Sequence, residues 1–196
     1  MSKGEKAIIR CRSDYAYGPG GQGPIPADAT LNFDVELIDF YPKRKEMHEM
    51  SDEEKLEEAT KFKQQGTDLF KEKDFGSAVA KYEEACKMFD EDALSSIDGA
   101  LAILTACKLN SAQCCINLNA YSHGVDCCNT VLQIDATNIK GLYRRGVCRN
   151  HTGNPEGAIT DLNEALRLDP TNAAAKLELS RAKKQISDAK KKEKVS

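Results

Sequence analysis

This sequence lacks a run of apolar residues long enough to span a bilayer, and nothing in it resembles a signal peptide. We therefore expect no membrane span and an intracellular protein, in the cytoplasm with the nucleus as the second choice. The net charge is only −3, which gives no reason to expect a nucleic-acid partner. The three histidines, His48, His123 and His151, fall at a linker or at helix ends. No serine, cysteine or carboxylate is arranged around them, so the helical part shows no catalytic centre.

The sequence also lacks the cysteine spacing of a zinc site, although it has eight cysteines. Adjacent side chains, as in Cys114–Cys115 and Cys127–Cys128, point about 100° apart on a helix, and ligand pairs two to four residues apart are missing. We therefore expect no metal and no cofactor. Cys115 and Cys128 take repeat positions that usually carry bulky apolar residues facing each other. Packed free thiols are the prediction, and a disulfide or redox role is the alternative.

A stretch from Asn138 to Asn172 has the pattern of a helix, a tight turn and a second helix. Gly153 to Pro155 ends the first helix and begins the second, because glycine adopts the left-handed conformation and proline fits a first helical turn. Small residues mark where the helices approach, and Pro170 follows the second helix. This pattern is typical of a tetratricopeptide (TPR) unit, and its small residues are Gly146, Ala158 and Ala165.

The same pattern recurs. Ala112 lies 34 residues before Gly146, the length of a TPR unit. A third copy is centred on Gly66, with Ala78, Tyr82 and Ala85 at the matching offsets. About one extra helical turn or loop, roughly 12 residues, is inserted near Asp90 to Gly99. We predict three TPR units, against an ordinary helical bundle with accidental alanine spacing. The expected helices run from Ser51 to about Lys71, from Lys73–Phe75 to about Phe89, and over Ile97–Asn119, Ser122–Gln133, Ile139–Asn150, Pro155–Leu168 and Asn172 to about Lys190, the last being a capping helix.

Residues 1–42 fall outside the repeats. Glu5–Arg12 and Ala29–Phe40 are expected strands, the second with Leu31, Phe33, Val35 and Leu37 on one face. A glycine-rich loop, Gly18–Pro24, separates them. Two strands are marginal alone, so we expect this segment to be loosely attached or paired with another copy. The fold class is therefore mainly α, with three TPR repeats and a capping helix after a β-rich fragment. The expected segments are the β-rich fragment at 1–42, a linker at 43–50, the TPR domain with its capping helix at 51–190, and a basic tail at 191–196. Ser51 and Glu54 form a predicted capping box at the start of the TPR domain.

The N-terminal segment resembles part of a known family. Asp14-Tyr15-Ala16-Tyr17-Gly18, Ala29-Thr30-Leu31 and Phe33–Leu37 are similar to the C-terminal part of an FK506-binding-protein (FKBP) type peptidyl-prolyl isomerase domain. The resemblance implies that Tyr17, Ile25 and Phe33 border the proline-binding pocket. It also implies that the rest of the pocket belongs to a preceding half that this chain does not contain, so we expect the chain alone to be inactive. Plain core aromatics are the alternative.

The first helices of the three repeats carry polar residues in matching places. Lys63 and Thr67 are four residues apart, as are Lys140 and Arg144, and Asn110 takes the equivalent surface of the middle repeat. Like charges four residues apart destabilise a helix by a few tenths of a kcal/mol, about as much as one favourable surface pair stabilises it. Two cations kept at this spacing suggest that an anion binds between them. The alternative is that they only solvate the helix.

This spacing resembles the two-carboxylate clamp of TPR co-chaperones. The resemblance implies a partner, the C-terminal Met-Glu-Glu-Val-Asp peptide of the ninety-kilodalton heat-shock chaperone, or the tail of the seventy-kilodalton one. The family usually has asparagine where this chain has Thr67. An isomerase of the full-length protein and a TPR scaffold for an unrelated partner are the other hypotheses. The basic segment Arg181–Lys194 predicts either calmodulin or acidic-lipid binding, or simply a solvated helix end.

Overall fold

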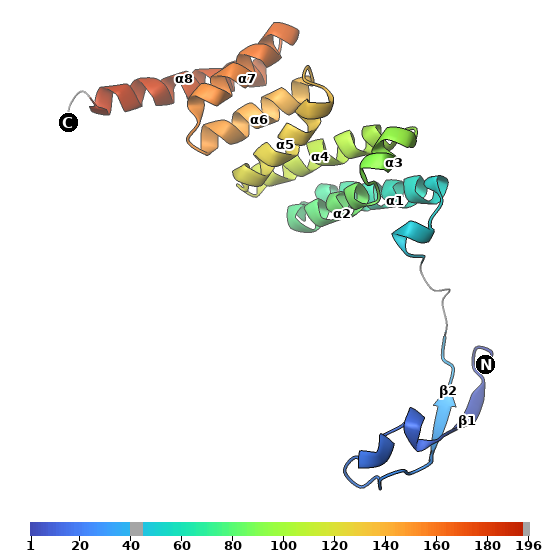
Figure 1. The fold of residues 1–196 in the computed structure, drawn as a ribbon. Helices are drawn as coiled ribbons and strands as arrows, with labels where there is room; N and C mark the ends of the chain where they lie inside the picture. The colour runs from blue at the N-terminus through green and yellow to red at the C-terminus, as the bar shows by residue number, and fades with distance from the viewer. Residues whose placement is uncertain (40–44, 194–196) are drawn as a thin grey trace. The chain divides into compact units, whose positions relative to one another are not determined.

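The computed structural model describes residues 1–39 and 45–193, with side chains as far as residue 191. The chain divides into two compact units, Met1–Lys45 and Glu46–Ser196 (Figure 1). Phe40, where the second strand was expected to end, and part of the predicted linker at 43–50 lie outside the described residues.

The N-terminal unit is a two-stranded antiparallel sheet. Strand β1 is Lys6–Cys11 and β2 is Leu31–Glu36, and Ile9 lies opposite Phe33 in the register. Both predicted strands are present, although each is shorter than expected. Two short 3-10 helices follow β1, η1 (Ser13–Tyr15) and η2 (Gly18–Gly20).

The second unit begins with a short 3-10 helix, η3 (Met47–Glu49), and then α1 (Asp52–Lys71). The predicted capping box is confirmed: the Glu54 amide donates to Ser51 Oγ at 3.3 Å and the Ser51 amide donates to Glu54 Oε2 at 2.9 Å. Two of the otherwise unpaired amides at the helix start are thereby satisfied. Asp74 caps the next helix by accepting from the Ser77 amide. The remaining helices are α2 (Phe75–Lys87), α3 (Glu91–Ser96), α4 (Ala100–Asn117), α5 (Tyr121–Ile134), α6 (Ile139–His151), α7 (Pro155–Leu168) and α8 (Ala173–Glu193).

The predicted helix from Ile97 to Asn119 is wrong at its start. The insertion forms α3, which Asp90 caps through the Ala93 amide, and Gly99 then has φ +89° before α4 begins at Ala100. A residue with a Cβ seldom adopts that conformation. The inserted residues therefore make an extra helical turn, one of the two forms expected for them, and Gly99 separates it from α4.

Small residues let the paired helices approach. A Cβ on Gly66 would lie 2.8 Å from the Tyr82 ring, and one on Gly146 would lie 2.7 Å from Leu162 Cγ. The middle repeat has Ala112 at this position, packed in a cluster with Cys127 and Cys128. Since a cysteine is smaller than tyrosine or leucine, that repeat has room for the extra methyl group.

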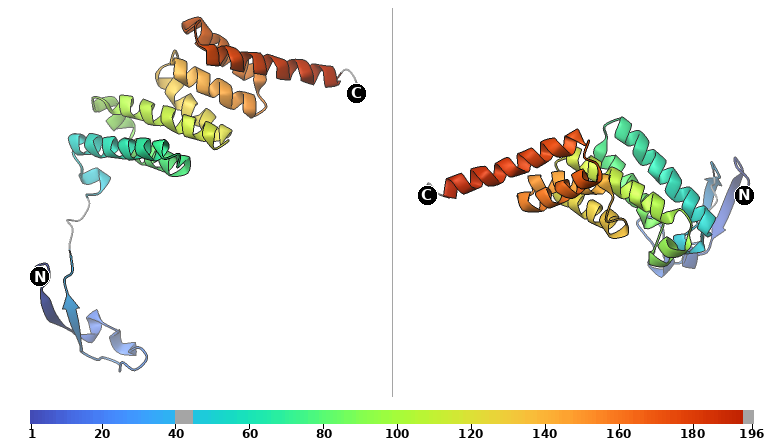
Figure 2. Two further views of the ribbon diagram at one scale, coloured as in Figure 1. Left: turned by 180° about the vertical axis from the view of Figure 1, so that it is seen from behind. Right: turned by 90° about the horizontal axis from the view of Figure 1, so that it is seen from above.

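The helices pack in chain order, apart from α3, which rests against α4, and α8 closes the stack against α7. The stacked antiparallel pairs are visible from two directions in Figure 2. The first helices of successive repeats also meet, α1 with α4, α4 with α6, and α6 with α8. They form one continuous face of the TPR array. Among the described residues, no helix is long and apolar enough to cross a membrane.

Candidate functional site

The predicted clamp residues all lie on the helices that form this shared face. Lys63 and Thr67 are on α1, Asn110 is on α4, and Lys140 and Arg144 are on α6. Lys140 is exposed, and the other four are half-buried. The helices of this face therefore carry cations in the first and third repeats and an amide in the middle repeat.

Tyr82, on α2, connects two of these helices. Its hydroxyl donates to Thr67 Oγ1 at 3.3 Å, and the Thr67 hydroxyl donates to the Lys63 carbonyl at 2.9 Å. Burial raises the pKa of Tyr82, and hydrogen bonds with Thr67 and Asn110 oppose that rise. Because Tyr82 is only 1% exposed, its hydroxyl is buried behind Thr67 of α1, to which it donates. The sequence pattern indicated Tyr82 only as a core residue.

Arg144 is tied to the middle repeat. One of its nitrogens, Nη1, donates to the Leu109 carbonyl of α4 at 2.7 Å. Burial lowers the pKa of Arg144, and the nearby thiols of Cys128 and Cys114 act in the opposite direction. A guanidinium with five N–H donors keeps further donors after one such bond. Poor solvation of this cation favours pairing with an anion.

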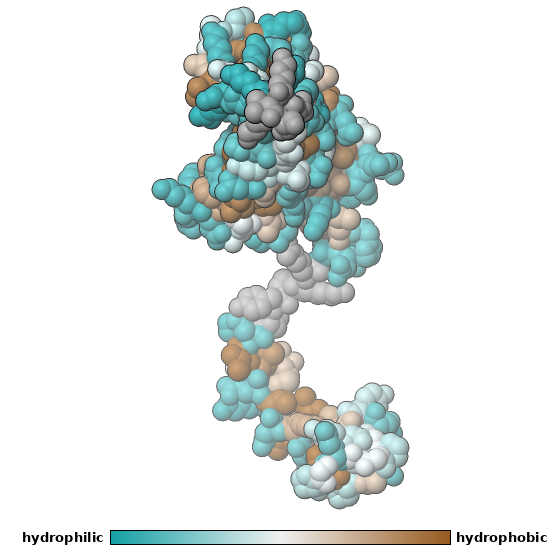
Figure 3. Space-filling view, turned by 90° about the vertical axis from the view of Figure 1, so that its left-hand side faces the viewer, coloured by the Kyte–Doolittle hydropathy of each residue, from teal (hydrophilic) through white to brown (hydrophobic). Residues whose placement is uncertain are grey.

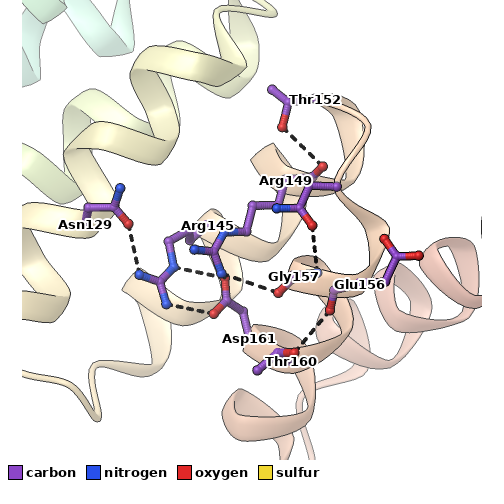
Figure 4. A network of polar contacts seen from close by, with 9 residues as sticks. Asn129, Arg145, Arg149, Thr152, Glu156, Gly157, Thr160 and Asp161 are labelled. Carbon is purple, nitrogen blue, oxygen red and sulfur yellow. Dashed lines mark hydrogen bonds and ion pairs between the residues drawn. The ribbon is translucent and has the colours of Figure 1, made fainter.

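An ion-pair network that was not predicted from the sequence joins α6 to α5 and α7. Asp161, on α7 and 3% exposed, accepts from Arg145 through both carboxylate oxygens and from Arg149. Arg145 also donates to Asn129 of α5 at 2.9 Å. Figure 4 shows these side chains converging between the three helices. In the sequence, two arginines four residues apart with an aspartate further along look like an ordinary surface ion pair. The network could therefore not be singled out from the sequence.

The cysteines are free, and six of the eight are buried, which confirms the prediction of packed thiols. Interaction with Cys127, the neighbour of its predicted partner Cys128, raises the pKa of Cys115. Burial raises the pKa of Cys128 to about 12. Within the described part of the chain, no group of three or more histidine, cysteine or acidic side chains is placed to hold a metal ion.

The histidines serve packing and surface contacts. His151 stacks on Tyr121 with ring centroids 4.3 Å apart, and His123 Nε2 lies 3.3 Å from a Glu83 carboxylate oxygen. Neither contact brings a nucleophile to a base, so these two histidines have no arrangement for catalysis.

The predicted pocket residues of the N-terminal unit do not form an enclosed site there. Tyr17 is 44% exposed and Phe33 is 38% exposed, while Ile25 is half-buried in a loop bridged to Gln22. Apolar surface is visible on this unit in Figure 3. A proline pocket needs walls around the ring, and these exposed side chains do not enclose one.

The basic C-terminal helix is anchored through its first half. Ala175 and Ala182 of α8 are fully buried and Ile186 is half-buried, whereas the lysines at 183, 184, 190 and 191 are exposed. The apolar stripe thus faces the repeats. Calmodulin or lipid binding there stays a prediction.

Residues 1–38 match the family model for FKBP-type peptidyl-prolyl cis-trans isomerase. The bovine peptidyl-prolyl cis-trans isomerase FKBP4 is 38% identical over 200 residues, covering 97% of this chain and 43% of that protein. The chain thus spans less than half the length of this relative.

Solved structures resemble the helical unit. The C-terminal TPR-containing domain of a Plasmodium falciparum FK506-binding protein has a TM-score of 0.69 and 30% identity, covering 74% of this chain and 99% of that one. The second TPR domain of human RPAP3, in complex with the HSP70 peptide SGPTIEEVD, has a TM-score of 0.57 and 26% identity, covering 66% of this chain and 98% of that one. The myosin chaperone UNC-45 of C. elegans, in complex with an Hsp90 peptide, has a TM-score of 0.59 and 25% identity, covering 66% of this chain and 14% of that one.

Proposed function

Because the chain belongs to the FKBP-type immunophilins, as a C-terminal part of an FKBP domain fused to a TPR domain, we propose that its helical unit binds the acidic C-terminal peptide of a heat-shock chaperone through a two-carboxylate clamp. The clamp consists of Lys63, Thr67, Asn110, Lys140 and Arg144. The full-length protein would use it to tether an isomerase domain to the chaperone.

One observation carries this proposal. Arg144 is a half-buried guanidinium whose Nη1 donates to the Leu109 carbonyl at 2.7 Å, which fixes this α6 side chain against α4. A preoriented, poorly solvated cation gains more from a carboxylate than a solvated one does, because less side-chain entropy and less hydration are lost. Two of the structures that resemble this unit, the second TPR domain of RPAP3 and the chaperone UNC-45, were solved in complex with an HSP70 peptide and an Hsp90 peptide respectively.

The test is calorimetry with the peptide Met-Glu-Glu-Val-Asp on the wild type, Lys140→Ala and Arg144→Ala. We expect about micromolar affinity for the wild type and at least a tenfold loss, about 1.4 kcal/mol, in each variant. Higher salt should weaken binding, since charge pairs near a surface are screened. Circular dichroism checks that helicity is retained.

Arg167→Ala is the matched control, because Arg167 is an exposed cation on α7 paired with Glu164 and lies away from the clamp helices. Its affinity should equal that of the wild type. Unchanged affinity in both Lys140→Ala and Arg144→Ala would contradict the clamp, and would favour a TPR scaffold for an unrelated partner.

The family match over residues 1–38 supports a second activity, peptidyl-prolyl isomerisation, for a longer protein that completes the pocket. Residues 1–196 alone should not accelerate prolyl isomerisation, since Tyr17 and Phe33 remain exposed. A protease-coupled assay tests this. Catalysis by this chain that an FKBP-pocket inhibitor abolishes would overturn the prediction.

A further inference from the structure

Thr67 has no hydrogen to offer a carboxylate in the arrangement that the structure shows. A threonine hydroxyl carries one hydrogen and can accept two. Its hydrogen is used by the Lys63 carbonyl at 2.9 Å, since a carbonyl can only accept. The bond at 3.3 Å between the two hydroxyls must then be donated by Tyr82 to Thr67.

Tyr82 is in turn constrained on both sides. With its own hydrogen committed to Thr67, the Tyr82 oxygen can only accept a further hydrogen bond, and Asn110 of α4 is near enough to lower the pKa of Tyr82. Its ring is buried against Gly66, where a Cβ would come within 2.8 Å, so the ring cannot withdraw. The hydrogens therefore run in one direction, from Tyr82 to Thr67 to the Lys63 carbonyl, across α2 and α1.

We propose that Tyr82 and Thr67 form a hydroxyl relay for carboxylate recognition, an inference that rests on the proposed clamp. When a peptide carboxylate enters the groove, the Thr67 hydroxyl rotates and donates to it, while Tyr82 continues to donate to Thr67. Tyr82 is thus a positioning residue, which keeps the Thr67 oxygen in place and polarises its hydrogen toward the ligand.

The rotation is favourable for two reasons. The Lys63 carbonyl keeps its helical bond from the Thr67 amide, so it is not left unpaired. The new bond is to an ionised acceptor and is stronger than the neutral bond it replaces.

The relay is specific to the first repeat. Cys128 and Leu162 occupy the position of Tyr82 in the other two repeats, and neither carries a hydroxyl. Thr67 is therefore the one clamp residue, among those described, with a buried hydroxyl donor directly behind it.

The experiment is calorimetry with Met-Glu-Glu-Val-Asp on Tyr82→Phe in three backgrounds: the wild type, Thr67→Val and Thr67→Asn. Phenylalanine keeps the ring that fills the space beside Gly66, and circular dichroism and melting confirm the fold. In the wild-type background Tyr82→Phe should weaken binding about three- to tenfold. In Thr67→Val it should have no further effect. In Thr67→Asn it should also have none, since an amide brings its own donors.

An equal loss from Tyr82→Phe in all three backgrounds would show a general packing effect and overturn the relay, as would no loss in the wild-type background. Arg144→Ala separates the two proposals. If Arg144→Ala weakens binding and Tyr82→Phe does not, only the relay fails. If the wild type does not bind the peptide, the clamp itself fails.

Discussion

Arg145 and Asp161 are joined by two nearly parallel hydrogen bonds, Nε to Oδ2 at 2.9 Å and Nη2 to Oδ1 at 2.8 Å. A planar guanidinium and a carboxylate fit each other in this two-bond geometry. With Arg149 on the same carboxylate at 2.8 Å, the aspartate is neutralised by two cations at a nearly buried position. The pairing fixes α6, the helix of Lys140 and Arg144, against α7.

Removing Asp161 should therefore destabilise the helical unit strongly. Asp161→Ala leaves two partly buried arginines without their anion, and breaking a buried pair in this way costs about 3–5 kcal/mol. Urea unfolding followed by circular dichroism measures the change. Glu164→Ala, which removes an exposed pair on the same helix, is the control and should change stability little. Similar stability for the two variants would mean that the Asp161 network contributes nothing special.

The close contact at Gly66 predicts a second loss of stability. Gly66→Ala would place a Cβ 2.8 Å from two carbons of the buried Tyr82 ring, and overpacking of this kind costs about 1–3 kcal/mol. Gly76→Ala is the matched control, because the nearest atom to its Cβ, Asp74 Oδ1, is 3.9 Å away. There the methyl group should stabilise α2 slightly, since alanine has the better helix propensity. Thermal melting should move in opposite directions for the two variants.

The buried thiols predict that the helical unit weakens in alkali. Burial raises the pKa of Cys114 and Cys148 to about 11 and that of Cys128 to about 12, from an ordinary 9.0. Above about pH 9 the unfolded chain releases these protons and the folded protein retains them, so stability is full below that pH and falls as the pH rises toward 11 to 12.

Cys128→Ala should make this fall shallower, because it removes one titrating group from the core. Cys11→Ala changes a thiol of the N-terminal sheet and should leave the slope for the helices unchanged. Melting temperatures between pH 8 and 10.5 measure both slopes. A Cys128→Ala slope as steep as that of the wild type would show that other groups cause the alkaline weakening.

Deleting residues 1–45 should leave the helical melting transition nearly unchanged. The helical unit has its own buried core around Tyr82, Cys107 and Leu162, and the division of the chain places this core within residues 46–196. Differential scanning calorimetry compares the full chain with residues 46–196. A large drop in the melting temperature would indicate that the sheet stabilises the repeats. In a dilute sample of the full chain, amides of β2 should exchange faster than those of α4.

The repeats could be predicted from sequence because their signals are local. Gly146, Ala158 and the turn at Gly153–Pro155 each restrict one short stretch of backbone, and the same offsets recur. The start of α4 could not be predicted, because a left-handed Gly99 and a capped α3 produce no periodic apolar pattern. Helix ends were otherwise close, since Ser51 and Pro155 carry direct capping chemistry.

The polar contacts of the site needed the folded chain. The spacing of the repeats predicted that the first helix of each repeat carries the proposed clamp residues, and the structure has them on those helices: Lys63, Thr67, Asn110, Lys140 and Arg144. The hydroxyl of Tyr82 was not predicted, because its partner Thr67 lies on another helix and a tyrosine at this position looks like a core residue. Arg144 to the Leu109 carbonyl, 35 positions apart, is likewise a contact between a side chain and the backbone of a neighbouring repeat.

The matched sizes at the helix crossings limit how freely the repeats could be exchanged during evolution. Gly66 faces Tyr82 and Gly146 faces Leu162, whereas Ala112 packs beside two cysteines. A hybrid hairpin with the first helix of the middle repeat and the second helix of either neighbour would set a methyl group against a large side chain. The reverse hybrid would leave a void instead. Recombination at the turn inside a repeat is therefore disfavoured, and the whole hairpin is the smallest piece of this domain that can be duplicated or transplanted without further change.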